Sequence, residues 1–245
     1  MSDMLRLDRF MAECGVGSRK QAVSIIKAGR VSVDGNIVKE PGLKISDGST
    51  VLLDGTALKH EKFSYYMLNK PMGCVSAVKD NLSDTVLEYL KGVHARGLFP
   101  VGRLDKDTEG FLLITNDGEL CHALISPGRH VEKTYYVISD KRLPRNARFL
   151  FKKGIDIGDE SLCLPAHLKA IGPVKEGMSY ELTLTEGRFH QVKRMFYALG
   201  CKVLYLKRVS IGGVMLDPGL DTGAFRALTT EELDILKNGT SEVKP

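Results

Sequence analysis

The sequence is poor in aromatic residues: it has no tryptophan, 8 tyrosines and 9 phenylalanines among 245 residues. A flat partner for a stacked ring must therefore come from tyrosine, phenylalanine, histidine or arginine. Cysteines are also few and lie far apart, at Cys14, Cys74, Cys121, Cys163 and Cys201. Because no two of them have the close spacing of a zinc knuckle or a redox dithiol, the pattern favours reduced thiols in a cytosolic protein.

Long hydrophobic runs are missing as well. No apolar stretch approaches the roughly 20 residues that a helix needs to cross a bilayer. The N-terminal segment MSDMLRLDRF is charged and has no apolar core, which is not typical of a signal peptide. We therefore expect a cytoplasmic protein without membrane contact, built as one large domain or as a small and a medium one.

Positive charge is present but unevenly distributed. The chain has 35 Lys+Arg against 30 Asp+Glu, and a formal net charge of +5 is weak support for a polyanionic partner. The distribution is more informative, because the segment 16–32 has no acidic residue and the segment 186–208 has one. The basic residues of the first segment are Arg19, Lys20, Lys27 and Arg30. Those of the second are Arg188, Lys193, Arg194, Lys202, Lys207 and Arg208.

The first 58 residues predict two small helices and a few strands. Ser18 and Gln21 form a capping box before a helix, and Gly29 suits the left-handed position after it. Asp34-Gly35 and Asp54-Gly55 each predict a tight hairpin. With its motifs R-L-D-x-F, S-R-x-x-A and G-x-V-x-V-D-G, the segment 5–51 resembles the S4 RNA-binding domain. The resemblance implies RNA contacts by Arg6, Arg19, Lys20, Lys27 and Arg30.

The rest of the chain predicts an α+β domain with a mainly antiparallel sheet. Strand-like runs such as YYMLNKP, TYYVISD and SYELTLTE alternate with turn signals and two helical stretches. We expect an S4-type domain over 1–58, a linker over 59–64, a second domain over 65–238 and a disordered tail over 239–245.

The stretch VGRLDKDTEGFLLITNDGEL, residues 101–120, holds three carboxylates within five positions. Lys106 to Gly110 is typical of a turn, and Phe111 to Thr115 predicts a strand that ends at the turn signal Asn116-Asp117-Gly118. Asp105 lies next to Leu104 and close to Arg103. That setting suits a carboxylate that must stay ionised and yet be desolvated enough to react.

Three segments resemble the RsuA branch of the pseudouridine synthases. The first is G-R-L-D-x-x-T-x-G-F-L-L-I-T-N-D-G, and the resemblance implies that Asp105 is the nucleophile and that Arg103 helps to flip the base. It gives no chemical role to Asp107, Glu109 or Asp117. The second comprises the turn N-K-P-x-G within 65–76 and K-x-Y within 132–137. It implies that Tyr135 stacks on the base while its neighbour Tyr136 faces the other side of the strand.

The third segment, EGRFHQVKRMFYALG, predicts a helix that ends at Gly200. Its buried face combines Val192, Met195, Phe196 and Leu199. The resemblance implies that Lys193 faces Asp105, although many family members have arginine there and a lysine lacks the bidentate fork. It implies RNA contacts by Arg188, His190, Gln191 and Arg194.

The resemblance implies isomerisation of a uridine in ribosomal RNA, by a monomer that needs no cofactor and no metal. The sequence motif H-Q-V-K-R-M-F favours small-subunit (16S) rRNA, of the uridine-516 type, over large-subunit (23S) rRNA as the substrate. Asp105 would either attack the ribose or abstract its C2′ proton, and free RNA and a partly assembled particle both remain open as substrates. The alternatives from other classes are a non-catalytic ribosome-assembly factor with an S4 domain, and a glycosidase-like hydrolase that would release free uracil.

Overall fold

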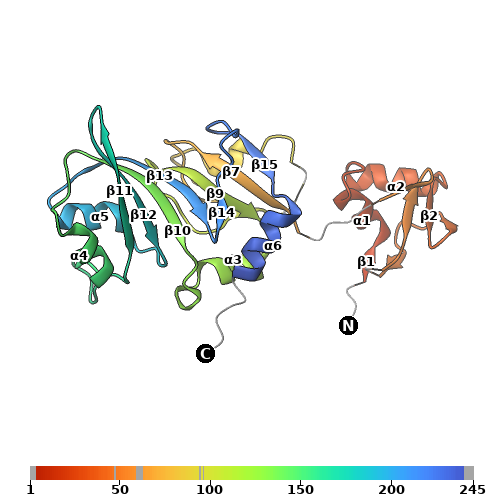
Figure 1. The fold of residues 1–245 in the computed structure, drawn as a ribbon. Helices are drawn as coiled ribbons and strands as arrows, with labels where there is room; N and C mark the ends of the chain where they lie inside the picture. The colour runs from red at the N-terminus through yellow and green to blue at the C-terminus, as the bar shows by residue number, and fades with distance from the viewer. Residues whose placement is uncertain (1–3, 47, 59–62, 94, 96, 240–245) are drawn as a thin grey trace. The chain divides into compact units, whose positions relative to one another are not determined.

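The computed structural model describes residues 4–46, 48–58, 63–93, 95 and 97–239 (Figure 1). Contacts divide the chain into two units, Met1–Phe63 with Gly92–Arg96 and Ser64–Lys91 with Gly97–Pro245. Residues 59–62 of the expected linker and 240–245 of the expected tail lie outside the described residues. Gly239 is the last residue of helix α6 (Thr230–Gly239).

The N-terminal unit packs two short helices on two small sheets. Its elements are β1 (Leu5–Arg6), α1 (Leu7–Glu13), α2 (Arg19–Lys27), β2 (Val31–Val33), β3 (Asn36–Val38), β4 (Lys44–Ile45), β5 (Val51–Leu53) and β6 (Thr56–Ala57). The capping box of Ser18 and Gln21 is confirmed, and so is the positive φ of Gly29. The hairpin at Asp34-Gly35 is confirmed by the pairing of β2 with β3.

A separate hydrophobic core holds this unit together. Leu7 and Met11 of α1 pack with Ala22 and Ile26 of α2, and all four are fully buried. Asp8, on the same helix, is also buried, and its carboxylate accepts hydrogen bonds from the guanidinium groups of Arg6 and Arg19.

The buried carboxylate predicts a pH-dependent stability. Hydrogen bonds from Arg6 lower the pKa of Asp8 from 3.8 to about 2, so its contribution is present above pH 4 and lost as the pH falls towards 2. Because both arginines are about half exposed, solvent screens the pairs. We expect Asp8→Asn to destabilise the unit by about 1 kcal/mol at pH 7 and by almost nothing near pH 2.

Thermal unfolding at the two pH values would measure this difference. Glu13→Gln provides the control, since it removes an exposed i,i+4 pair with Arg9 on the same helix. Such pairs contribute only about 0.3–0.5 kcal/mol. A loss from Asp8→Asn that is equally large at pH 2 and pH 7 would contradict the electrostatic explanation.

The second unit is built on one large sheet with strand order β11-β12-β10-β13-β9-β7-β15, to which β14 and β8 add at β13 and β9 (Figure 1). Its strands are β7 (Tyr65–Lys70), β8 (Phe99–Pro100), β9 (Glu109–Thr115), β10 (Lys133–Ser139), β11 (His167–Val174), β12 (Gly177–Leu184), β13 (Val203–Ile211), β14 (Val214–Met215) and β15 (Phe225–Ala227). Its helices are α3 (Gly118–Ile125), α4 (Ala147–Lys153), α5 (Gln191–Ala198) and α6, with short 3-10 turns at η1 (Val86–Tyr89) and η2 (Pro127–Arg129). Together with the N-terminal unit, this sheet confirms the expected α+β fold.

Two hydrophobic clusters fix the helices to the sheet. Leu120 and Leu124 of α3 and Leu236 of α6 pack with Phe111 and Leu113 of β9. At the other end, Phe196 of α5 makes edge-to-face contacts with Phe151 of α4 and Tyr180 of β12. Among the described residues, no helix is long and apolar enough to span a membrane.

The sheet is mainly antiparallel, as expected, but the expected bounds of β9 were wrong. The strand begins at Glu109 rather than Phe111, because Glu109 and Gly110 pair in parallel with Lys207 and Arg208 of β13. A Cβ atom at position 110 would collide with the backbone of Arg208, so glycine is required for this close approach. The turn-like stretch is therefore shorter than the sequence predicts.

The expectation of two helical stretches in this unit was also wrong, since α3, α4, α5 and α6 are all present. The signal Asn116-Asp117-Gly118 begins α3 instead of closing a turn. Asp117 is its N-cap, and its side chain accepts a hydrogen bond from the backbone N–H of Leu120. Asp and Asn favour turns and helix N-caps alike, so the residue types alone do not separate the two.

Candidate active site

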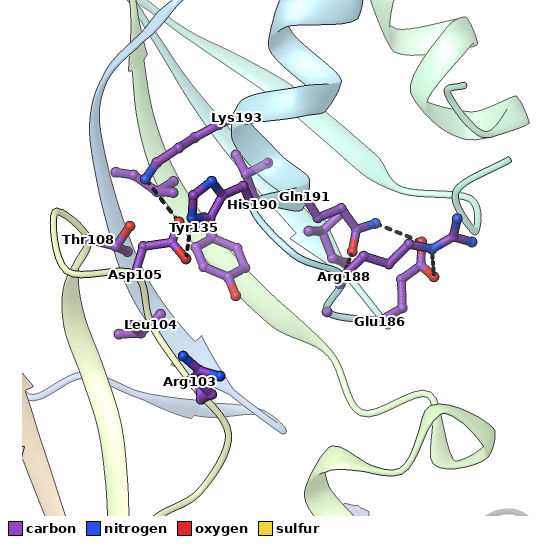
Figure 2. Close-up of a pocket in the computed structure, with 14 residues that line it drawn as sticks. Arg103, Leu104, Asp105, Thr108, Tyr135, Glu186, Arg188, His190, Gln191 and Lys193 are labelled. Carbon is purple, nitrogen blue, oxygen red and sulfur yellow. Dashed lines mark hydrogen bonds and ion pairs between the residues drawn. The ribbon is translucent and has the colours of Figure 1, made fainter. Parts of the chain in front are cut away.

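Asp105 lies in a pocket between the loop that precedes β9, strand β10 and the start of α5 (Figure 2). Arg103, Tyr135 and Lys193 line the same pocket, so the structure brings together the four residues to which the sequence assigns chemistry. The side chain of Asp105 is 25% exposed. A carboxylate in this position is partly desolvated and can still be reached by a ligand.

Two basic side chains face the two oxygens of Asp105. Lys193 Nζ donates to Oδ2 at 2.9 Å, and His190 Nε2 lies 3.6 Å from Oδ1. Lys193 also donates to Asp107 Oδ1 at 2.5 Å. Partial burial opposes the charge on Lys193, but the hydrogen bonds to Asp107 and Asp105 outweigh it, and the pKa of Lys193 is raised. Lys193 therefore stays protonated beside Asp105.

The start of α5 places these two basic groups. His190 is the N-cap residue and has a positive φ of 50°, and its ring stacks on that of Phe189 at 3.8 Å. Val192, Met195 and Phe196 are buried, as expected, while Leu199 is only partly buried. The buried face orients the helix, and Lys193 then projects from its side towards Asp105 (Figure 2).

The backbone of the Asp105 loop is held by Lys70, the last residue of β7, and by Ser76 in the segment that follows it. Lys70 is fully buried, and its Nζ donates to the carbonyl oxygens of Pro71, Asp105 and Thr108 at 2.9–3.1 Å. Ser76 Oγ donates to the carbonyl of Leu104 and accepts from its N–H. Burial lowers the pKa of Lys70. The contacts of Lys70 and Ser76 therefore fix the backbone of the loop that carries Asp105.

The base-stacking candidate is placed by the sheet. Tyr135 is buried on the pocket side of β10, whereas Tyr136 makes an edge-to-face contact with Tyr205 on β13. Thr108 also lines the pocket, and among the described residues its Oγ1 has no hydrogen-bond partner. Arg103 is exposed at the pocket wall and lies outside every ion pair described for the chain.

The other candidate RNA-binding residues near α5 hold a neighbouring loop. Arg188 pairs with Glu186 and donates to the carbonyls of Ser161 and Leu162. Gln191 is 4% exposed, and its amide bonds Glu186 and the N–H of Arg188. Arg194 pairs with Asp159 and donates to the carbonyl of Ile157. Arg188 and Gln191 also line the Asp105 pocket, whereas Arg194 does not.

The candidates in the N-terminal unit fall into two groups. Arg6 and Arg19 bind Asp8, and Arg30 pairs with Asp54. Lys20 and Lys27 are exposed on α2 and take part in none of the described ion pairs. The side chain of each of the three arginines is nevertheless about half exposed.

Sequence reasoning missed the support role of Lys70 and Ser76. Both lie within the quoted N-K-P segment, but a buried lysine that bonds three carbonyls leaves no pattern in the sequence. His190 was expected among RNA-binding residues, and the structure places it against Asp105. Within the described ranges, no group of three His, Cys, Asp or Glu side chains could hold a metal ion.

The chain is similar to known proteins over most of its length. A family model for RNA pseudouridylate synthase matches residues 64–198, and one for the S4 domain matches residues 5–51. The chain is 42% identical to the uncharacterized RNA pseudouridine synthase YtzG of Bacillus subtilis (strain 168), covering 95% of this chain and 98% of that one. It is 41% identical to the ribosomal small subunit pseudouridine synthase A of Escherichia coli (strain K12), covering 94% and 98%.

A solved structure is also similar to this chain over most of its length. The "Crystal structure of pseudouridylate synthase" has a TM-score of 0.65 and 38% sequence identity, and the match covers 95% of this chain and 99% of that chain. Pseudouridine synthases are isomerases, and the match extends over both units. The chain therefore belongs to the RNA pseudouridylate synthase family and carries an S4 domain at its N-terminal end.

Proposed function

We propose that this chain converts a uridine of small-subunit ribosomal RNA into pseudouridine, with Asp105 as its nucleophile. The observation that carries the chemistry is the position of Asp105, bonded to Lys193 at 2.9 Å in a pocket that Tyr135 also lines. Support for the substrate comes from relatives in Escherichia coli and Pseudomonas aeruginosa. Both are named for the ribosomal small subunit and are 41% and 42% identical to this chain.

In the proposed reaction the target uridine leaves its helix and enters the pocket. Flipping costs a few kcal/mol, which contacts from Arg103 and stacking on Tyr135 would offset. The bond between C1′ and N1 then breaks, the uracil turns, and a bond forms between C1′ and C5. The C5 proton leaves and N1 gains a proton, so the product is an isomer of the substrate. Asp105 either attacks C1′ and is later displaced, or removes the C2′ proton as uracil departs and returns it when C1′ bonds C5; both routes need its ionised form.

Lys193 would hold the carboxylate of Asp105 in position. Its ammonium group lies 2.9 Å from one carboxylate oxygen of Asp105, and His190 Nε2 lies 3.6 Å from the other. The carboxylate of Asp107 pairs with the same Lys193 ammonium group, but the side chain of Asp107 is 71% exposed. We therefore assign Asp107 to the support of Lys193 and not to the reaction.

The substrate can be tested by mapping pseudouridine across both rRNAs in a strain that lacks this protein. We expect one small-subunit site to be lost and all large-subunit sites to be retained. A plasmid copy of the wild-type gene should restore the site. Loss in the large subunit would overturn the specificity, and an unchanged map would overturn ribosomal RNA as the substrate.

An rRNA substrate implies action in the cytoplasm, on free RNA or on a partly assembled small subunit. We propose that the protein acts as a monomer. We also propose that the N-terminal unit, residues 1–58, binds RNA through the exposed faces of Lys20, Lys27 and the arginines beside them, while residues 65–238 perform the reaction.

A further inference from the structure

The segment around α4 carries strong and uncompensated positive charge. Between Lys141 and Lys153 there are six basic residues and no acidic one. They are Lys141, Arg142, Arg145, Arg148, Lys152 and Lys153, and all six are exposed. Arg188 and Arg194 near the pocket are bound by acids, whereas these six form no ion pair with any described residue. Such a surface attracts a polyanion.

Part of this charge lines a cleft of about 670 Å³, here called the α4 cleft. The cleft is lined by Arg145, Arg148, Phe149 and Lys152 on and before α4. It is also lined by residues at the start of β11 and at the end of β12. Phe149 is 57% exposed, and Lys153 Nζ lies 5.0 Å from the centre of its ring. An exposed aromatic ring among cations offers a base a stacking surface while the cations bind phosphates.

The α4 cleft and the Asp105 pocket lie at the same end of the sheet. Strand β12 ends where β10 and β11 begin, since it is antiparallel to both. Thr183 and Thr185 line the cleft, whereas Leu184, which lies between them, lines the pocket. Successive side chains of a strand point to opposite faces, so the two sites are separated by little more than one strand.

We infer that the α4 cleft binds the backbone of the same RNA strand whose uridine enters the Asp105 pocket. Arg148 and Lys152 contact phosphates, and Phe149 stacks on an unpaired base. The occupant is RNA because three cations of the cleft, Arg145, Arg148 and Lys152, outnumber its one acid, Glu132, and because the family acts on RNA. The inference rests on that family membership and not on small-subunit specificity, so the rRNA map does not decide it.

Binding of a 20-nucleotide uridine oligomer to the full chain tests this inference. The variant Arg148→Gln/Lys152→Gln loses two positive charges. Because it removes two cations that bind phosphates, affinity in 0.1 M salt should fall roughly 25-fold, and the slope of log affinity against log salt should decrease by about 1.4. Lys175→Glu, just beyond the far end of β11, changes the net charge by the same amount and should leave both values nearly unchanged.

A photo-crosslinking amino acid in place of Phe149 gives a second readout that does not depend on affinity. We expect it to label the same oligomer, whereas the same substitution at Lys175 should not. Equal weakening by the two charge variants, or no label at position 149, would overturn the inference. Competition by poly-glutamate as effective as that by unlabelled RNA would also overturn it, in favour of an acidic protein segment.

Discussion

Replacing Asp105 by Asn is expected to lower kcat for pseudouridine formation by at least roughly 10⁴-fold while RNA binding changes little. The amide keeps the size of the carboxylate but cannot act as a nucleophile or as a base. The expectation is therefore the same for attack on the ribose and for removal of the C2′ proton. Tritium release from RNA labelled at C5 of uridine would measure turnover, and filter binding would measure affinity.

Asp107→Asn is the matched control for this experiment. Asp107 lies two residues away, bonds the same Lys193 ammonium group and is mostly exposed. The control removes the same charge from the same loop, so we expect only a small loss of turnover. Normal turnover by Asp105→Asn, or equal losses in the two variants, would contradict the assignment of Asp105.

Lys70→Met is expected to impair both turnover and stability. The change leaves three carbonyl oxygens, those of Pro71, Asp105 and Thr108, without their donor in a buried place. Each unpaired buried group costs about 1–3 kcal/mol, and the removal of a buried charge offsets part of the sum. We expect the free energy of unfolding to fall by about 3 kcal/mol and kcat to fall at least roughly 10²-fold, because the loop carrying Asp105 shifts.

The two effects can be separated by assaying Lys70→Met well below its unfolding temperature. A positioning role predicts that kcat stays low where the protein is fully folded, with KM little changed. Lys106→Met serves as the control, since Lys106 is an exposed lysine of the same loop that bonds only Ser83 among the described side chains. Normal kcat in the folded Lys70→Met protein would show that Lys70 contributes to stability alone.

Local features of the fold could be predicted because neighbouring residues determine them. The capping box of Ser18 and Gln21, the hairpin at Asp34-Gly35 and the buried face of α5 all depend on residues close in sequence. Asp105 and Lys193 are 88 residues apart, and only the resemblance to a known family predicted that they face each other.

Features that depend on distant backbone contacts could not be predicted. Strand β9 begins two residues early because Gly110 fits against β13, nearly 100 residues further along the chain. Lys70 resembles an ordinary surface lysine in the sequence, and its burial depends on carbonyl groups that the folded loop brings to it. The hydrogen bonds of Arg188 and Arg194 to the loop at 157–162 also depend on tertiary structure, and the RNA contacts expected of these two residues stay a prediction.

The order of the functional residues along the chain has a consequence during protein synthesis. The S4 domain has its own hydrophobic core and emerges from the ribosome first, whereas Lys193 and strand β13 are added late. A product truncated before Lys193 would keep the S4 domain and lack the cation beside Asp105. Such a fragment would also lack β13, the middle strand of the large sheet, so we expect it to keep a folded N-terminal unit but to form no Asp105 pocket.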